Sequence, residues 1–260
     1  MHHPHPVSDW RARVRAAADQ PPARPRVPLW WAQHRIGSVE PGLLEPLGLA
    51  PEVLRPGRDG WVLGGDCSAS LHLLAHALRE AGLSHAWRDE QLAVAGEAGE
   101  IVGSVERGVV RPLGIPTLAV HLMARAPDGR HWVQQRSLTK PNDPGLWDTL
   151  MGGMVPASDS VAQALARETW EEAGLQLTQL HALHHGGRFL MRRPTGAGAA
   201  GYVVEWVEWY GCVLPDGVVP RNMDGEVQDF RCLPPDELER MLDAGAFTVE
   251  AACVLAAAGV

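Results

Sequence analysis

The sequence predicts an α/β protein of the α+β kind, built in two parts. In the second part a short apolar strand, the pair Gly152-Gly153 and an acidic helix follow one another. In the first part, short strand-like segments accompany one helix whose apolar residues recur at helical spacing. The chain has 260 residues, 45% of them hydrophobic and 21% charged, which suffices for one large domain or two modest ones.

The chain begins with a predicted arm, residues 1–28. Residues 8–19 have helical composition, and four prolines within residues 19–28 then mark a linker. A small α+β domain is predicted over residues 29–103, and residues 29–39 look strand-like within it. A patternless stretch with three glycines ends this domain. Its helix carries apolar residues at helical spacing, which are Leu71, Leu74, Ala75 and Leu78.

A larger domain is predicted over residues 104–260, where strands and helices mix. Asp128-Gly129 is the tight turn of a predicted hairpin, and residues 235–245 form a terminal helix. The predicted strands cover residues 116–126, 128–137, 146–154, 200–214 and 224–233. The acidic helix, residues 158–175, is opened by Ser158, Asp159 or Ser160 and closed by Gly174.

Composition excludes several classes of function. The count of 23 Lys and Arg against 31 Asp and Glu leaves a net charge of −8, which disfavours a protein that coats nucleic acid. The longest apolar runs fall short of the roughly 18 residues that a membrane-spanning helix requires. No secretory signal is recognisable at the N-terminus, so a cytoplasmic location is expected. The four cysteines form no CxxC pair, which argues against a disulfide framework and a zinc ribbon.

The acidic helix carries three glutamates on one side. At 100° per residue, Glu168, Glu171 and Glu172 fall within about 100° of arc. Like charges at this spacing repel by a few tenths of a kcal/mol per pair, so the cluster gains nothing unless a cation lies beside it. Mg²⁺ or Mn²⁺ fits, because these hard cations prefer oxygen ligands. A solvated helix face is the alternative interpretation.

The spacing around these glutamates decides between the two interpretations. It resembles the Nudix box, in which a glycine, an acid, an Arg-Glu pair, a Glu-Glu pair and a glycine follow at fixed intervals. The matching residues are Gly153, Arg167, Glu168, Glu171, Glu172, Gly174 and Leu175. Leu175 matches only as an apolar residue, and the other six identities coincide by chance on the order of 10⁻⁷ per starting position. Two positions depart from the pattern, since Asp159 stands where the family has Glu and Thr169 replaces an apolar residue.

The resemblance to Nudix hydrolases implies a Nudix-type α/β/α sandwich with a mixed sheet, preceded here by the small α+β domain. It also implies that Glu168, Glu171 and Glu172 hold Mg²⁺ or Mn²⁺. Arg167 is then expected to orient a carboxylate rather than to touch substrate. Asp159 either assists the metal or caps the helix.

Hydrolysis of a diphosphate requires metal to neutralise oxygens and a carboxylate to accept a proton. The candidates for this base are Glu171, Glu172 and Glu226, and the sequence leaves their order open. For Glu226 a polar strand face is the alternative interpretation. We expect Glu171 and Glu172 to be an exposed acid pair, so that their replacement by Gln leaves folding nearly intact.

Five further residues are candidates for binding the substrate. Arg136 and Lys140 flank a proline-bearing loop and suit a diphosphate, because arginine pairs with two phosphate oxygens and lysine supplies a point charge. Trp147 suits stacking on a substrate ring. Gly152 and Gly153 allow the backbone to approach metal or phosphate closely. The alternatives are surface solvation for the cations, a core position for the tryptophan and a plain turn for the glycines.

A narrower resemblance covers most of the chain. Residues 105–122, 134–155 and 224–230 are similar to the Nudix proteins related to thiamine-pyrophosphokinase-associated domains, and residues 35–41 and 87–94 to the small domain that precedes them. This resemblance implies cleavage of thiamine diphosphate, or of its oxidised or damaged analogues, to the monophosphate. The expected partner is thus a small-molecule diphosphate, with neither nucleic acid nor membrane, and a homodimer is left open.

Three other functions remain open. One is a Nudix hydrolase of nucleoside diphosphate derivatives such as ADP-ribose or dinucleotides. Another is an isopentenyl-diphosphate isomerase-like enzyme, which needs a reactive cysteine, and none of the four cysteines lies in a recognisable match. The last is a Nudix-fold sensor that binds its ligand without cleaving it. Such sensors usually have an eroded box, whereas Glu168, Glu171 and Glu172 are all present, so catalysis is favoured.

Overall fold

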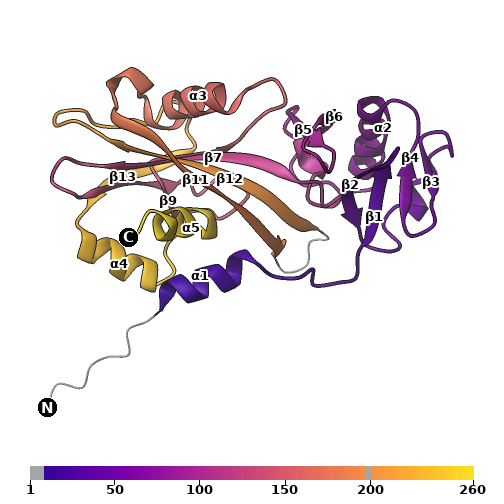
Figure 1. The fold of residues 1–260 in the computed structure, drawn as a ribbon, viewed down its shortest axis with the longest axis horizontal. Coiled ribbons are helices and arrows are strands. Elements are labelled where there is room, and N and C mark those ends of the chain that lie inside the picture. The colour runs from indigo at the N-terminus through magenta and orange to yellow at the C-terminus, as the bar shows by residue number, and fades with distance from the viewer. Residues whose placement is uncertain (1–8, 197–200) are drawn as a thin grey trace, which may run out of the picture.

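A seven-stranded mixed sheet lies at the centre of the larger part of the molecule (Figure 1). The computed structural model describes residues 9–196 and 201–260, so the first eight residues of the predicted arm lie outside the described residues. The strands are β7 (Thr117–Arg125), β8 (His131–Arg136), β9 (Trp147–Asp148), β10 (Met151–Met154), β11 (His181–Pro194), β12 (Tyr202–Val213) and β13 (Val227–Leu233). Their order is β11-β12-β7-β8-β13, with β10 paired to β7 and β9 to β8. Only the described pair of β12 and β7 is parallel in this sheet.

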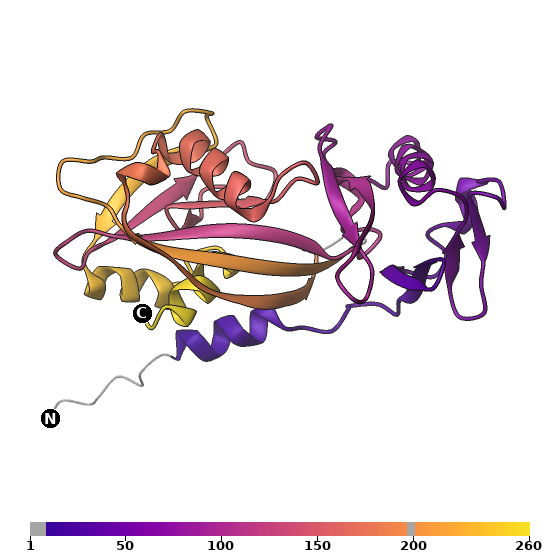
Figure 2. The ribbon, with the colours of Figure 1, turned by 45° about the horizontal axis from the view of Figure 1, so that its top comes forward.

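Helices cover both faces of this sheet, as predicted. Helix α3 (Val161–Ala173) packs on one face, where Ala164 and Leu165 join Val120 and Leu122 in one core. The other face is covered by α1 (Trp10–Ala18), α4 (Pro235–Asp243) and α5 (Val249–Ala257), as Figures 1 and 2 show. The expected α/β/α sandwich is therefore confirmed. None of the described helices is long and apolar enough to cross a membrane.

The described residues of the smaller part form a four-stranded sheet, a two-stranded sheet, one α-helix and the short 3-10 helix η1 (Glu45–Leu47). Its elements are β1 (Val27–Trp31), β2 (His34–Val39), β3 (Leu54–Pro56), β4 (Trp61–Leu63), α2 (Cys67–Glu80), β5 (Gln91–Ala95) and β6 (Ile101–Glu106). The strand order is β2-β1-β4-β3, and β5 pairs with β6. The apolar residues predicted to line one face of α2, from Leu71 to Leu78, are fully buried in one core.

Several predicted local elements are confirmed. Ser160 caps α3 in a reciprocal capping box with Gln163, and Gly174 ends the helix in the left-handed conformation with φ of 64°. The hairpin of β7 and β8 turns at Asp128-Gly129, where Gly129 has φ of 88°. These elements are coded by short sequence signals that act locally, which is why the sequence predicts them well.

Other expectations were wrong. The single strand over 146–154 is two strands, because Thr149 turns the chain by donating its hydroxyl to the carbonyl of Met151 at 2.8 Å. The helix over 235–245 is not terminal, since α5 follows it. The long edge strand β11 was not predicted, because most of its first half is exposed and shows no alternation of apolar residues.

The two predicted division points also meet secondary structure. The break near residue 104 lies inside β6, because residues 101–106 pair with β5. The arm contributes α1, whose Trp10 is 1% exposed within the core shared with α5. Arg11 donates from Nε to the carbonyl of Val260 at 2.9 Å, so the two ends of the described chain meet. The division into 1–28, 29–103 and 104–260 stays a prediction.

We expect Trp10→Ala to destabilise the larger part of the protein. Removing a fully buried indole leaves a cavity and costs about 3–5 kcal/mol in the free energy of unfolding. Trp206→Ala is the matched control, since Trp206 is 37% exposed and its ring contacts Arg188 at 4.3 Å, so that its removal leaves no enclosed cavity and should cost clearly less than the loss of Trp10. Denaturant titration measures both, and equal effects of the two variants would contradict the packing of α1.

Candidate functional site

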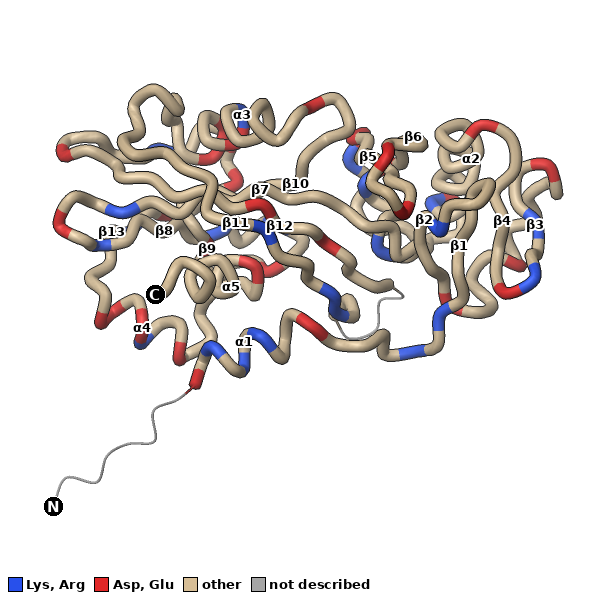
Figure 3. The backbone as a smooth tube through the Cα atoms, in the orientation of Figure 1, with Lys and Arg blue, Asp and Glu red and all other residues tan. Residues whose placement is uncertain are grey.

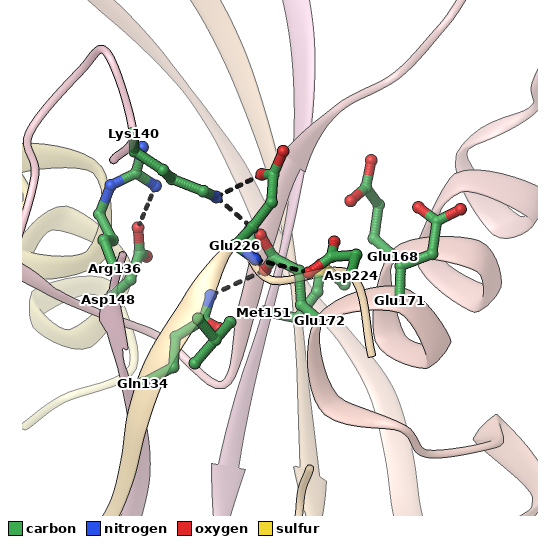
Figure 4. Close-up of polar contacts among 12 residues, drawn as sticks. Gln134, Arg136, Lys140, Asp148, Met151, Glu168, Glu171, Glu172, Asp224 and Glu226 are labelled. Atoms are coloured by element: carbon green, nitrogen blue, oxygen red, sulfur yellow. Dashed lines mark hydrogen bonds and ion pairs between the residues drawn. The ribbon is translucent and has the colours of Figure 1, made fainter. Parts of the chain in front are cut away.

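Helix α3 places Glu168 and Glu172 against the glycines of β10, while Glu171 lies beside Arg167 on the same helix (Figure 4). They differ in exposure: the side chain of Glu171 is 40% exposed, that of Glu168 is 14% exposed and that of Glu172 is 2% exposed. Acidic positions along α3 are visible in Figure 3. One helix face therefore presents carboxylates at three depths.

Arg167 binds three carboxylates at once. Its Nη1 donates to Glu168 at 3.0 Å and to Glu171 at 2.8 Å, and its Nε donates to Asp159 at 3.0 Å. The strong negative charge around it raises the pKa of Arg167, although burial opposes this. The helix cap is Ser160, so the expectation that Asp159 caps α3 was wrong. The shorter Asp159 side chain serves instead to hold Arg167.

Glu172 is buried and fully engaged. Its Oε2 accepts hydrogen bonds from Nε2 of Gln134 at 2.7 Å and from the backbone N–H of Gly152 at 3.1 Å. Its Oε1 lies 3.1 Å from Nζ of Lys140. Burial raises the pKa of Glu172, while Lys140 and Gln134 act in the opposite direction. The expectation that Glu171 and Glu172 form an exposed pair was therefore wrong for Glu172, because the loop that carries Lys140 and strand β8 close over it.

Lys140 links the helix to Glu226, which precedes β13. Its Nζ lies 2.7 Å from Oε2 of Glu226 and is itself only 10% exposed as a side chain. Although burial acts to raise the pKa of Glu226, the hydrogen bond and charge of Lys140 outweigh it and lower that pKa. A local hydrogen bond orders the loop before β13, because the side chain of Asp224 accepts the backbone N–H of Glu226 at 2.8 Å. Glu226 is thus an ionised acid opposite α3, as Figure 4 shows.

The two glycines of β10 make room for side chains. A Cβ on Gly153 would lie 2.5 Å from the carboxyl carbon of Glu168, so this carboxylate rests directly on the glycine. A Cβ on Gly152 would lie 2.5 Å from the ring of His121. Glycine at both positions is required by close approach rather than by a turn, since both lie within the strand and pair with β7.

Two candidate substrate residues have other partners. Arg136 donates from Nη1 to Asp148 at 3.4 Å and from Nη2 to the carbonyl of Asn142 at 3.0 Å, and so braces the proline-bearing loop. Trp147 packs against the core that contains α5, with the guanidinium of Arg231 at 5.6 Å from its ring. The stacking of Trp147 on a substrate ring stays a prediction, and this packing does not support it. Successive residues of a strand face opposite sides, so Trp147 faces the α5 side of the sheet and its neighbour Asp148 faces the other side.

Sequence reasoning missed a buried polar network behind the glycines. His121 contacts the hydroxyl of Thr149 at 3.0 Å, and Asp148 accepts the N–H of Thr149 at 2.8 Å. Gln134, which holds Glu172, was also missed, because nothing in the strand sequence HWVQQR distinguishes it from its neighbour Gln135, and only the structure shows that it is buried. These residues fix the turn between β9 and β10 and hence the position of Gly152.

Comparison with known proteins identifies the family. The NUDIX domain profile matches residues 116–253. The chain belongs to the Nudix family. It is 29% identical over 155 residues to Nudix hydrolase 20, chloroplastic, of Arabidopsis thaliana, covering 55% of this chain and 38% of that protein. It is 31% identical over 159 residues to a Nudix hydrolase of Streptomyces coelicolor, covering 56% of this chain and 83% of that protein.

The fold comparison agrees with the family. A Deinococcus radiodurans protein of known crystal structure superimposes with a TM-score of 0.51 and 20% identity, covering 64% of this chain and 96% of that one. This likeness concerns the fold alone. The chain spans about two fifths of the length of its first curated relatives, both chloroplastic Nudix hydrolases of Arabidopsis thaliana. Hydrolases of the Nudix family act on diphosphate bonds, which agrees with the acidic helix found here.

The Nudix box supplies oxygen ligands, but they are engaged with protein cations. Among residues 9–196 and 201–260, no three Asp, Glu, His or Cys side chains converge on one point as a ready metal site. The side chains of Arg167 and Lys140 occupy the positions beside Glu168, Glu171 and Glu172 where the predicted metal ion would bind. The donor set itself is hard and anionic, and the Gly153 surface that holds the Glu168 carboxylate leaves space for no side chain. The donor set is therefore of the chemical kind that Mg²⁺ or Mn²⁺ takes, and the binding of such an ion by Glu168, Glu171 and Glu172 stays a prediction.

Glu168 of the Nudix box carries an unusual proton affinity. Burial is the largest cause that raises its pKa, to about 7 from 4.5, and the charge of Glu172 adds to it, while Arg167 opposes it. At pH values between the ordinary pKa of glutamate and the raised pKa of Glu168, the folded chain therefore binds one more proton than the unfolded chain. Stability from this group is lost as pH rises through that range, because the unfolded chain releases the proton first.

We expect Glu168→Gln to remove this pH dependence. In EDTA the melting temperature of the variant minus that of the wild type should increase between about pH 5 and about pH 8, since Gln has no proton to lose. Differential scanning calorimetry across this range measures the difference. A difference that does not change with pH would contradict the raised pKa of Glu168.

Proposed function

We propose that this protein is a Mg²⁺- or Mn²⁺-dependent hydrolase that cleaves a diphosphate bond in a small cofactor-like molecule. The observation that carries the proposal is the carboxylate of Glu168, seated on Gly153 beside Glu171 within a complete Nudix box. An acid cluster of this kind has little structural value of its own, because like charges on neighbouring turns repel.

In this proposal Glu168, Glu171 and Glu172 hold the divalent ion. Glu168 and Glu171 share one guanidinium group, and Glu171 is exposed enough to turn. Glu172 requires that Lys140 moves toward Glu226, with which it already pairs. When bound, the ion neutralises phosphate oxygens and lowers the pKa of water. Arg167 keeps the carboxylates of α3 oriented.

We assign the general base to Glu226. It lies outside the helix, its side chain is 46% exposed, and Lys140 keeps it ionised by lowering its pKa. An ionised, accessible carboxylate is able to accept a proton from an attacking water. Glu171 is the other open candidate, whereas Glu172 has its oxygens occupied by Gln134, Gly152 and Lys140.

For the substrate we propose thiamine diphosphate or its oxidised or damaged analogues, converted to the monophosphate, on the sequence resemblance alone. Lys140 and Gly152 are the substrate-side candidates that lie among the carboxylates. An isomerase function is disfavoured, because burial raises the pKa of Cys67 to about 11 and those of Cys212 and Cys253 to about 12. A cytoplasmic location and a homodimer stay predictions.

Release of orthophosphate and of monophosphate products over a panel of diphosphates tests this function. The panel contains thiamine diphosphate, its oxo and oxy analogues, ADP-ribose, a dinucleoside diphosphate and isopentenyl diphosphate, each with Mg²⁺, Mn²⁺ or EDTA. We expect metal-dependent turnover that is fastest with a thiamine compound. Faster turnover of ADP-ribose would move the substrate to nucleoside diphosphate derivatives. Absence of turnover on every compound would overturn the hydrolase assignment in favour of a ligand sensor.

The variants Glu171→Gln and Glu172→Gln should separate catalysis from folding. We expect Glu171→Gln to lower kcat by about 100-fold or more while the melting temperature stays nearly constant, since an exposed acid contributes little stability. Glu172→Gln should lower both, because it leaves Lys140 and the N–H of Gly152 with a weakened buried partner. Thermal melts and steady-state rates measure the two effects. A Glu171→Gln variant that melts early would show that this acid is structural.

Gly153→Ala tests the seat of the Glu168 carboxylate. The added methyl group displaces the end of a flexible side chain, so folding should survive while Mn²⁺ affinity and kcat/KM each fall about tenfold. Gly196→Ala is the matched control, because a Cβ there meets nothing within 4 Å. Mn²⁺ titration followed by electron paramagnetic resonance reports the affinity. Unchanged Mn²⁺ binding in Gly153→Ala would contradict the role of Glu168.

A further inference from the structure

The smaller part of the protein reaches the edge of the acidic site. The backbone N–H of Ala157, in the loop before α3, donates to the carbonyl of Gln91 at 2.8 Å. Leu92 of β5 and Pro156 form an isolated β-bridge beside it. Figure 2 shows the β5–β6 hairpin next to the start of α3. The loop that leads into the Nudix box helix is therefore built against the smaller part.

Arg88 lies close to this contact. Gln91 follows Arg88 by three residue steps, which span at most about 11 Å. The backbone N–H of Arg88 donates to Oε1 of Glu106 at 2.9 Å, and the same oxygen accepts the N–H of Gly108 at 3.2 Å. Glu106 is 2% exposed, so the backbone of Arg88 is fastened to a buried anchor. A rigid backbone directs a long side chain at low entropic cost.

The charge of Arg88 acts on the larger part of the protein. Burial raises the pKa of Glu226, but Lys140, then Arg88 and Arg107, lower it further than burial raises it. The contacts through Gln91 and Leu92 place the same segment beside the Nudix box loop. Figure 3 shows basic positions beside β5 and acidic positions along α3. The positive charge of Arg88, which belongs to the smaller part, therefore acts on the carboxylate of Glu226 in the site.

Arg88 differs from the other cations of this region in having no side-chain partner among the described residues. Lys140 pairs with Glu172 and Glu226, and Arg136 with Asp148. Arg107 pairs with Glu90 at 2.7 Å. The guanidinium of Arg88 is exposed and makes no hydrogen bond or ion pair in the described part of the chain. A free guanidinium presents parallel N–H groups that match two phosphate oxygens.

We propose that the smaller part completes the substrate site and that Arg88 binds a phosphate group of the diphosphate. In this proposal the acids of α3 and the base at Glu226 come from the larger part, and Arg88 adds positive charge from the smaller part. This inference rests on the proposed hydrolase function and adds a substrate-binding residue that lies outside the Nudix domain. Its ligand class is a diphosphate ester or inorganic imidodiphosphate with a divalent ion.

Arg88→Gln tests this inference, with Arg58→Gln as matched control. Arg58 is equally exposed, carries the same charge and lies in the turn between β3 and β4, at the far end of the smaller part (Figure 1). Isothermal titration with imidodiphosphate and Mg²⁺ measures binding without turnover. We expect Arg88→Gln to weaken binding and raise KM about tenfold, with kcat within about twofold, because one charged hydrogen-bonding partner is lost. Arg88→Lys should restore part of the affinity, and Arg58→Gln should match the wild type.

The outcomes separate this inference from the proposed function. If the wild type hydrolyses the panel and Arg88→Gln behaves like Arg58→Gln, the role of Arg88 is overturned and the hydrolase stands. If no compound is hydrolysed but imidodiphosphate binds in an Arg88-dependent way, the hydrolase falls and the phosphate contact stands. If the wild type neither hydrolyses nor binds, both are overturned. Equal thermal melts of the two variants exclude a folding defect.

Discussion

The structure depends on the neutralisation of carboxylates that are crowded onto one helix and its surroundings. Arg167 is held by Asp159, Glu168 and Glu171, and Lys140 is held by Glu172 and Glu226. Repulsion between acids grows as water is excluded, so the buried Glu172 is tolerable only with Lys140 and its hydrogen-bond donors in place. Lys140 ties together segments that are distant in the sequence, whereas Arg167 joins α3 to the loop directly before it. The arrangement of the site therefore follows from charge balance as much as from apolar packing.

The same balance makes the site responsive to a cation from solution. In the proposed function a divalent ion would compete with Arg167 and Lys140 for the same oxygens, and it would carry twice the charge of either side chain. Glu168 shows how incompletely the protein cations balance the cluster, since burial still raises its pKa to about 7. Gly153 leaves room for the Glu168 carboxylate, because any side chain at position 153 would occupy the same space. Metal binding and protonation are thus alternative ways of relieving one excess of negative charge.

The two parts of the chain are linked at the points where chemistry is proposed. The hydrogen bond between Ala157 and Gln91 joins the loop before α3 to the β5–β6 hairpin. Helix α1 returns from the start of the chain to pack Trp10 against the far side of the sheet. The domain boundaries predicted near residues 28 and 104 do not reveal these contacts, since the contacts join segments that are distant in the sequence. The smaller part supports the loop that carries the acidic helix, rather than only extending the chain.

Local signals in the sequence determined the Nudix box helix, its closing glycine and the placement of Glu168, Glu171 and Glu172 on one face, because helical geometry relates neighbours by fixed angles. The sequence left three candidates for the cap, and the structure selected Ser160. The sequence also determined two other local features. Helical spacing predicted the apolar face of α2, and the turn-forming pair Asp128-Gly129 predicted the hairpin. Only the tertiary structure decided that Glu172 is buried, that Trp147 turns toward α5 and that Arg136 braces a loop. It also decided the side-chain partners of Lys140 and Gln134, and that the backbone N–H of Arg88 is held by Glu106. These depend on which strand and loop lie across from each residue, and pairing between distant segments leaves no local periodicity to read.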